Sequence, residues 1–174
     1  RSRHFYAPER RASIVKSPIQ LVVQSIRELG TPIRDENVLL EATDLMGQNL
    51  LQPPSVKGWD GGRSWINTAT LFVRQNTLIY QLTGRLPGLD AAQKGAAAEP
   101  FASERLVDHL VTNGPPDPDL VVDYLLRFTL GTTPHPDRRE TVRAFLRDVG
   151  DRIDRDRITA ILALITAMPE YQLA

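Results

Sequence analysis

The chain has 174 residues, no cysteine, and 21 basic and 21 acidic side chains, so its formal net charge is zero. A chain of this length can fold as one domain without disulfides. The lack of cysteine also excludes thiol catalysis and cysteine metal ligands. The balanced charge argues against a nucleic-acid-binding surface. No apolar run approaches the roughly 18 residues of a membrane span, and residues 1–6 lack the apolar core of a signal peptide.

Apolar residues recur at helical spacing in several segments, and no segment alternates convincingly with period two. Ser17 and Pro18 suit an N-cap and a first helical turn, which predicts a helix that ends at Gly30. Asp35 is predicted to cap a second helix, whose apolar stripe continues to Leu50.

A third helix is predicted to start at Asn67 or Thr68 and to end at Gly84. Gln75 falls on its apolar face, as a buried polar residue that needs a hydrogen-bond partner. The apolar residues expected on this face are Leu71, Phe72, Leu78, Ile79 and Leu82.

Four further helices are predicted, beginning after Ser103, at Asp117, near Pro136 and at about Asp154. The fold class expected is therefore all-α, with about seven amphipathic helices in an irregular bundle.

The division of the chain follows from one segment of small residues. Residues 85–99 are rich in glycine and alanine and are predicted to be a flexible linker or surface loop. They separate an N-terminal helical part, residues 1–84, from a C-terminal helical part, residues 100–174. We expect the two parts to pack as one domain.

The segment between the second and third predicted helices, residues 52–67, is called the Trp loop here because it holds both tryptophans, Trp59 and Trp65. Its prolines and glycines prevent a regular helix or strand. The favoured interpretation is that both indole rings pack into the core and hold the loop in place. The alternative is a polysaccharide-binding surface, on which aromatic faces stack on sugars and charged groups reach hydroxyls. The candidate ligand-binding residues are Trp59, Trp65, Lys57, Asp60 and Arg63.

A supporting polar cluster is predicted behind the Trp loop, formed by Gln48, Arg27, Arg74 and Gln75. The favoured interpretation is a buried arginine that satisfies loop carbonyl groups. The alternative is an anion site for a sulfate or a carboxylate.

Residues with the spacing of a catalytic or metal site are lacking. His4, His109 and His135 lie on three different predicted elements and show no metal-ligand spacing. Ser55 and Ser64 have no histidine near them in the sequence. We therefore predict no catalytic residue, no metal and no cofactor, and favour a chain that is not by itself an enzyme.

Several motifs carry a family resemblance: Lys16-Ser-Pro, Met46-Gly-Gln, Pro53-Pro-Ser-Val-Lys-Gly-Trp, Trp65-Ile-Asn and Met168-Pro-Glu-Tyr-Gln-Leu. They are similar to the C-terminal part of a large bacterial family catalogued as domain of unknown function 1800. The resemblance covers essentially the whole chain, and family members carry a further N-terminal half. It implies a mostly helical protein that is exported to the periplasm or beyond, with no known activity. It also implies a sulfatase-like partner protein, because genes of the two families commonly lie side by side.

Three functions follow as hypotheses. The first is a helical structural or interaction module, the C-terminal portion of a larger exported protein that acts with a partner protein. The second is a polysaccharide-binding module that uses the Trp loop. The third is the non-catalytic half of an enzyme whose reactive groups lie in the N-terminal region. The exposure of the two indoles separates the first hypothesis from the second.

Overall fold

The computed structural model describes residues 7, 12–85, 117–131, 134–148, 150 and 153–174. Within these residues the regular structure is helical, and the only β-type pairing is an isolated antiparallel bridge between Val15 and Leu173. The elements are α1 (Pro18–Leu29), α2 (Glu36–Leu45), η3 (Gly62–Trp65), α3 (Thr68–Thr83), α5 (Pro118–Leu130), α6 (Pro136–Asp148), α7 (Arg155–Thr166) and η5 (Pro169–Gln172), where η marks a 3-10 helix. The all-α fold class is confirmed.

Two predicted segments lie outside the described residues: the helix expected after Ser103 and nearly all of the linker expected at residues 85–99. No helix in the described part of the chain is both long enough and apolar enough to cross a membrane.

α6 begins at Pro136, where its start was predicted. The other five described α-helices also begin where predicted, because local capping fixes their starts. In each case a side-chain oxygen accepts a hydrogen bond from a backbone N–H of the first turn, which would otherwise lack a partner inside the helix. At α3 the cap is reciprocal, since the Thr70 side chain in turn accepts a hydrogen bond from the backbone N–H of the cap residue. The capping residues are Ser17, Asp35, Asn67, Asp117 and Asp154.

The predicted extent of the second helix is wrong, because α2 ends at Leu45 and not at Leu50. Gly47 adopts a φ of 92°, a left-handed conformation that a helix cannot continue. The backbone N–H groups of Met46 and Gly47 close the last turn instead. As a result Met46 is fully buried, whereas Leu45 and Leu50, which were expected on the apolar stripe, are exposed.

The predicted face of the third helix is also partly wrong. Leu78 and Leu82 are buried as predicted, but Leu71 and Phe72 are 41% and 67% exposed. Along its length α3 turns polar residues inward, and these find partners within the protein, as buried polar groups must. The buried polar residues of α3 are Thr70, Arg74, Thr77 and Gln81.

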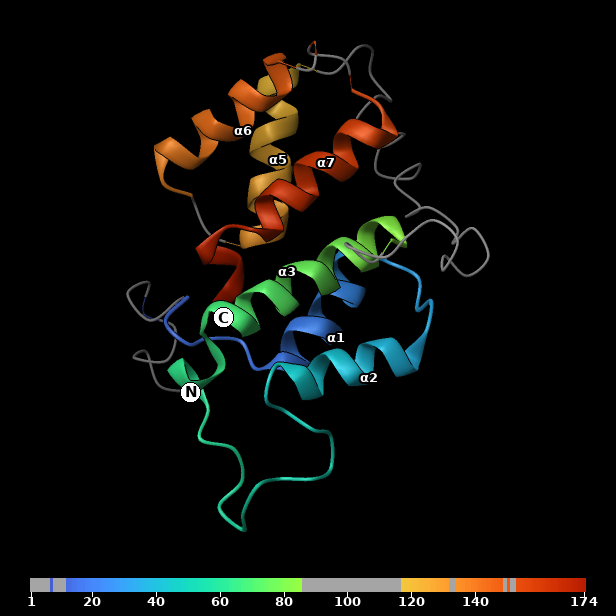
Figure 1. Ribbon diagram of the computed structural model, residues 1–174. Coiled ribbons are helices and arrows are strands. Elements are labelled where there is room, and N and C mark those ends of the chain that lie inside the picture. The colour runs from blue at the N-terminus through green and yellow to red at the C-terminus, as the bar shows by residue number, and fades with distance from the viewer. Residues whose placement is uncertain (1–6, 8–11, 86–116, 132–133, 149, 151–152) are drawn as a thin grey trace.

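The helices form two layers that share one interface (Figure 1). One layer holds α1, α2 and α3, coloured blue to green, and the other holds α5, α6 and α7, coloured yellow to red. α3 packs against α7 across the interface, and η5 returns the chain from α7 to the first layer. Two clusters of buried residues each centre on one layer but cross the interface: Leu29 of α1 and Leu82 of α3 belong to the cluster of α5–α7, and Tyr171 of η5 belongs to the cluster of α1–α3. Leu130 packs against both clusters. The C-terminal segment is therefore part of the N-terminal core.

Candidate functional site

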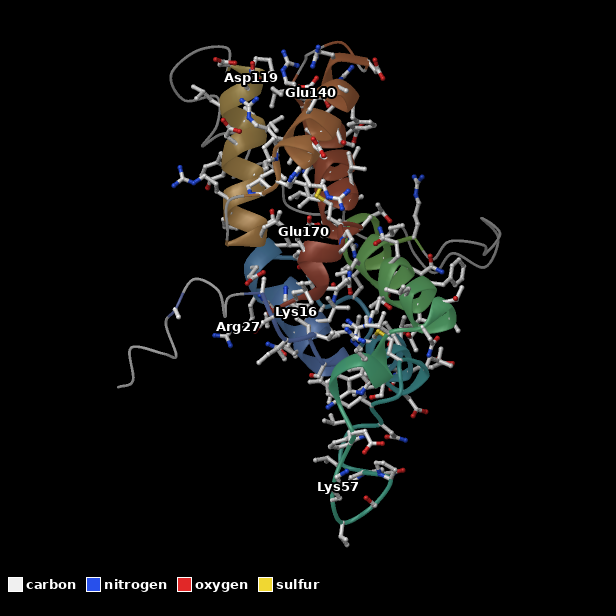
Figure 2. The ribbon with its side chains drawn as sticks, turned by 90° about the vertical axis from the view of Figure 1, so that its left-hand side faces the viewer. Lys16, Arg27, Lys57, Asp119, Glu140 and Glu170 are labelled. Carbon is white, nitrogen blue, oxygen red and sulfur yellow. The ribbon has the colours of Figure 1, made fainter. Side chains whose placement is uncertain are left out.

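The Trp loop projects from the helical body between α2 and α3, and Lys57 lies near its far end (Figures 1 and 2). Short-range hydrogen bonds hold it in a series of turns. The backbone N–H of Gly58 donates to Ser55 O at 2.9 Å, and that of Lys57 donates to Ser55 Oγ at 3.2 Å. The Ser64 hydroxyl donates to Gly61 O at 2.8 Å.

The two indoles are half-buried, so neither is a fully buried core residue and neither is freely exposed. The Trp65 ring lies against two glycines. A β-carbon added at Gly61 would lie 3.6 Å from this ring, and one added at Gly47 would lie 3.9 Å from it. Trp65 thus packs the base of the loop against the chain just beyond α2, while Trp59 lies earlier in the loop sequence.

The charged candidates of the Trp loop are exposed. Lys57 Nζ lies 3.3 Å from Asp60 Oδ1, and both side chains are about four-fifths exposed, at 81% and 79%. Such an exposed pair contributes little to stability, because solvent screens it. Arg63 is exposed as well. Two apolar side chains accompany these charges, since Leu51 is 87% exposed and Val56 is fully exposed.

Arg74 from α3 is the most deeply buried charged residue described, with no exposed surface. Its Nη2 donates to Lys16 O at 2.8 Å, and its Nη1 donates to Gln172 Oε1 at 3.1 Å. Burial lowers the pKa of the Arg74 guanidinium to about 10. Gln172 Nε2 donates to Thr166 O at 3.3 Å, and Gln172 O accepts from Lys16 N at 2.8 Å. Arg74 therefore ties both ends of the described chain to α3. The carbonyl that it satisfies belongs to Lys16 and not to the Trp loop.

The other three members of the predicted polar cluster lie elsewhere, and the structure does not bring the four together. Gln48 Oε1 accepts from Ile19 N at 3.0 Å, which supports the first turn of α1. Gln75 is partly buried, and its Nε2 donates to Ala163 O of α7 at 3.4 Å. Arg27 lies on the exposed side of α1 (Figure 2).

A buried charged group that the sequence analysis did not single out is Lys16, which is only 3% exposed. Its Nζ lies 4.2 Å from the centre of the Tyr171 ring, a cation–π contact. Burial lowers the pKa of Lys16; the charge of Glu28 opposes this shift, and the charge of Arg74 adds to it. Burial, followed by the charge of Glu28, raises the pKa of Tyr171, and its buried hydroxyl has no hydrogen-bond partner in the part of the chain that the structure describes.

A half-open cavity of about 280 Å³ lies beside this pair, and Lys16, Gln24, Glu28 and Glu170 line it. Glu28 Oε1 accepts a hydrogen bond from Gln24 Nε2, and Glu170 Oε1 accepts one from Arg138 Nε at 3.1 Å. The other carboxylate oxygen of each glutamate is buried and has no hydrogen-bond partner among the described residues. Figure 2 shows Lys16 and Glu170 near the point where η5 meets α1. The cavity thus holds one buried ammonium group and two incompletely bonded carboxylates.

A second concavity of about 260 Å³ lies between α1 and α2, and we call it the α1–α2 groove. Its lining is almost entirely apolar. Four of its side chains, Val23, Ile33, Leu40 and Leu50, are between 43% and 57% exposed. Leu50 also begins the segment that leads into the Trp loop.

Within the described part of the chain, no group of three histidine, aspartate or glutamate side chains is arranged to hold a metal ion. His135 is exposed beside Asp137, and its Nδ1 lies 3.3 Å from Asp137 Oδ2. His4 and His109 lie outside the described residues.

A family model described as "Protein of unknown function (DUF1800)" matches residues 1–173. The chain belongs to this family. No curated protein and no solved structure matches it. Membership in DUF1800 agrees with the resemblance of the motifs and with the helical fold, but it assigns no activity.

Lys16 and Glu170, two charged residues that line the cavity of this DUF1800 chain, fall inside motifs that carried the resemblance. Lys16 opens one motif, and Glu170 and Tyr171 lie in another at the far end of the sequence. The bridge between Val15 and Leu173 brings the two motifs together. The local sequence signal for this cavity is a lysine directly before a helix N-cap. It indicates a site only together with the residues that the fold brings beside it from distant parts of the sequence.

Proposed function

We propose that this chain is a protein-interaction module that binds a partner protein through the α1–α2 groove and the stem of the Trp loop. The observation that carries the proposal is the exposed apolar lining of the groove. Large contiguous apolar patches on soluble proteins commonly mark interaction sites. Here the exposed side chains belong to α1, to α2, to the segment that joins them and to the segment that follows α2.

The chemistry of the groove specifies the kind of partner. A groove between two helices suits the apolar face of a partner helix, which inserts side chains at helical spacing. Glu36 is one of the few polar residues of its lining and would favour a basic residue beside that face. Leu51, which follows Leu50 in the sequence, is a further exposed apolar side chain at the stem of the loop. The sulfatase-like protein implied by the family resemblance is the partner that we propose.

The proposal is tested by titrating the purified chain with that sulfatase-like protein in a calorimeter. Val23→Asp and Leu40→Asp place a charge in the groove at exposed positions, so the fold should tolerate them. Leu120→Asp is the matched control, because Leu120 is 67% exposed on α5, away from the groove. We expect the two groove variants to lose at least tenfold in affinity and the control to bind like the unaltered chain.

Three results would overturn the proposal. One is the absence of binding to the sulfatase-like protein, and another is an equal loss in the groove variants and in Leu120→Asp. The third is light scattering that shows a dimer which the groove variants dissociate, because the occupant would then be a second copy of this chain.

A second candidate function is polysaccharide binding by the Trp loop. The observation in its favour is that Trp59 is partly exposed close to the exposed pair of Lys57 and Asp60. Trp65 is less suited, because its ring is packed against glycines. Both tryptophans lie in this loop, so intrinsic fluorescence reports on it alone. In a Trp65→Phe variant, a saturable change with one soluble polysaccharide would support this function, whereas emission that no glycan perturbs would exclude it.

A further inference from the structure

The proposed interaction surface does not use the polar groups that line the cavity beside Lys16. Glu28 Oε2 and Glu170 Oε2 are buried without partners, although they come from different elements, α1 and η5, and line the same cavity. Buried polar atoms are normally hydrogen-bonded, so two carboxylate oxygens that lack a partner among the described residues leave room for donors from a ligand. Lys16 lines the same cavity, and only 3% of its surface is exposed.

Charge narrows the class of ligand. A divalent cation would suit the two carboxylates but would be repelled by the Lys16 ammonium group in the same cavity. An anion would suit Lys16 but would face Glu28 and Glu170. Hydroxyl groups satisfy both kinds of residue, because each can donate to a carboxylate and also accept from an ammonium group.

The size and the shape of the cavity narrow the class of ligand further. A volume of about 280 Å³ falls just below the roughly 300–1,000 Å³ of pockets that hold drug-sized molecules, so it suits a single ring. Phe128 lines the cavity and is 44% exposed. Its ring stacks on Tyr124 with 6.0 Å between centroids and an interplanar angle of 5°. A ring held in this way offers an apolar face to the C–H groups of a sugar.

We propose that this cavity binds one neutral pyranose-sized polyol, with Glu28 and Glu170 accepting from its hydroxyls, Lys16 donating to them, and Phe128 covering its apolar face. The polyol is either a free monosaccharide or the end residue of a longer neutral glycan, since the same groups are offered by both. The inference is independent of the groove between α1 and α2 and of the Trp loop.

The experiment titrates the full chain by calorimetry and by saturation-transfer NMR, because tryptophan emission reports only on the Trp loop. The probes are glucose, galactose, mannose and their neutral oligosaccharides, with a sulfated monosaccharide, free amino acids and Ca²⁺ alongside. We expect at least one neutral sugar to bind saturably, and we expect no binding of the sulfated monosaccharide, the amino acids or Ca²⁺. A monosaccharide that binds as tightly as its oligosaccharide identifies a free sugar as the ligand, whereas a preference for the oligosaccharide identifies a glycan end.

Matched variants place the binding in the cavity. Glu28→Gln removes one carboxylate with little change of shape, and Lys16→Met removes the ammonium group but keeps most of the length of the side chain. Glu36→Gln and Lys57→Met are the same changes at residues outside the cavity. We expect at least a tenfold loss of affinity in the first two and none in the controls. Trp59→Ala should also bind normally, which separates this site from the Trp loop.

Binding of none of the neutral sugars at millimolar concentration would overturn the inference. So would preferential binding of an amino acid, a sulfated sugar or Ca²⁺, or equal losses in the cavity variants and the controls. If Lys16→Met does not fold, Glu28→Gln decides the outcome alone. Failure of this experiment leaves the proposed protein interaction untouched, since the two use different residues.

Discussion

At the scale of single residues, Arg74 has a structural role although its side chain is charged. Its guanidinium is fully buried and holds Lys16 O and Gln172 Oε1, which lie on segments 58 and 98 residues away in sequence. Such a group contributes by joining distant segments, and its removal leaves buried acceptors without donors.

We therefore expect Arg74→Ala to lower the free energy of unfolding by about 3–5 kcal/mol, from the lost hydrogen bonds and the space left behind. Arg63→Ala is the control, because Arg63 is exposed on the Trp loop and its loss should stay within about 0.5 kcal/mol. Urea unfolding followed by circular dichroism measures both. Equal stability of the two variants would show that the buried guanidinium does not hold the segments together.

Tyr171 gives the opposite expectation, because its buried hydroxyl has no partner. Tyr171→Phe keeps the ring and its contact with Lys16 but removes the unpaired group. We expect the free energy of unfolding at pH 7 to stay the same or to rise by about 1 kcal/mol. A loss of more than that amount in urea unfolding would mean that the hydroxyl is hydrogen-bonded in solution.

The same residue predicts a pH dependence. Burial raises the pKa of Tyr171 above its usual 10.0 in the folded chain, so the folded state holds this proton more tightly than the unfolded state. Its contribution to stability is therefore complete below about pH 10 and is lost as the pH rises further. The lowered pKa values of Lys16 and Arg74 act in the opposite direction, so the measured quantity is the difference between the chain and Tyr171→Phe. That difference should shift in favour of the variant between roughly pH 9 and pH 11, the range around the pKa of a tyrosine in the unfolded chain. A constant difference would contradict the assignment.

At the scale of elements, α1 begins under two side chains that come from different parts of the chain. Ser17 Oγ accepts from Gln20 N at 3.1 Å, and Gln48 Oε1 accepts from Ile19 N at 3.0 Å. The first is a local cap of a kind that a sequence displays. The second depends on the turn after α2, in which Gly47 reverses the chain.

Gln48→Leu should cost about 1 kcal/mol of unfolding free energy, because it removes an acceptor from the first turn of α1. Gln48→Glu should cost less, since its carboxylate still accepts and is favoured near the positive end of a helix. Gln20→Leu, on the exposed side of the same helix, is the control. Thermal unfolding ranks the three. A Glu variant that is less stable than the Leu variant would show that Gln48 acts through packing alone.

At the scale of the whole molecule, the two helical layers share residues and should unfold together. Tyr171 belongs to the cluster of α1–α3 although it follows α7, and α3 packs against α7. A division at residues 85–99 into independent units would leave the first layer without part of its core.

A buried leucine of the second layer tests this coupling. Leu162 lies fully buried in α7, and Leu162→Ala should cost about 2–5 kcal/mol. The expected result is that the urea midpoint falls equally by circular dichroism and by tryptophan fluorescence, although both tryptophans lie beside the other layer. Leu164→Ala, at a partly buried position of the same helix, should have a smaller effect. A fluorescence midpoint that stays in place would show two independent units.

The sequence by itself determined the helical class and most helix starts, because a cap is a hydrogen bond between neighbours and a stripe is a local periodicity. Only the tertiary structure decided where α2 ends, which face of α3 is buried, and that Lys16, Glu28 and Glu170 share a cavity. Leu71 and Phe72 were expected inside because they are apolar, but Arg74 and Gln81 take the interior since their partners come from far along the chain. A local pattern cannot reveal such partners. The burial of a polar group depends on what the fold brings to meet it.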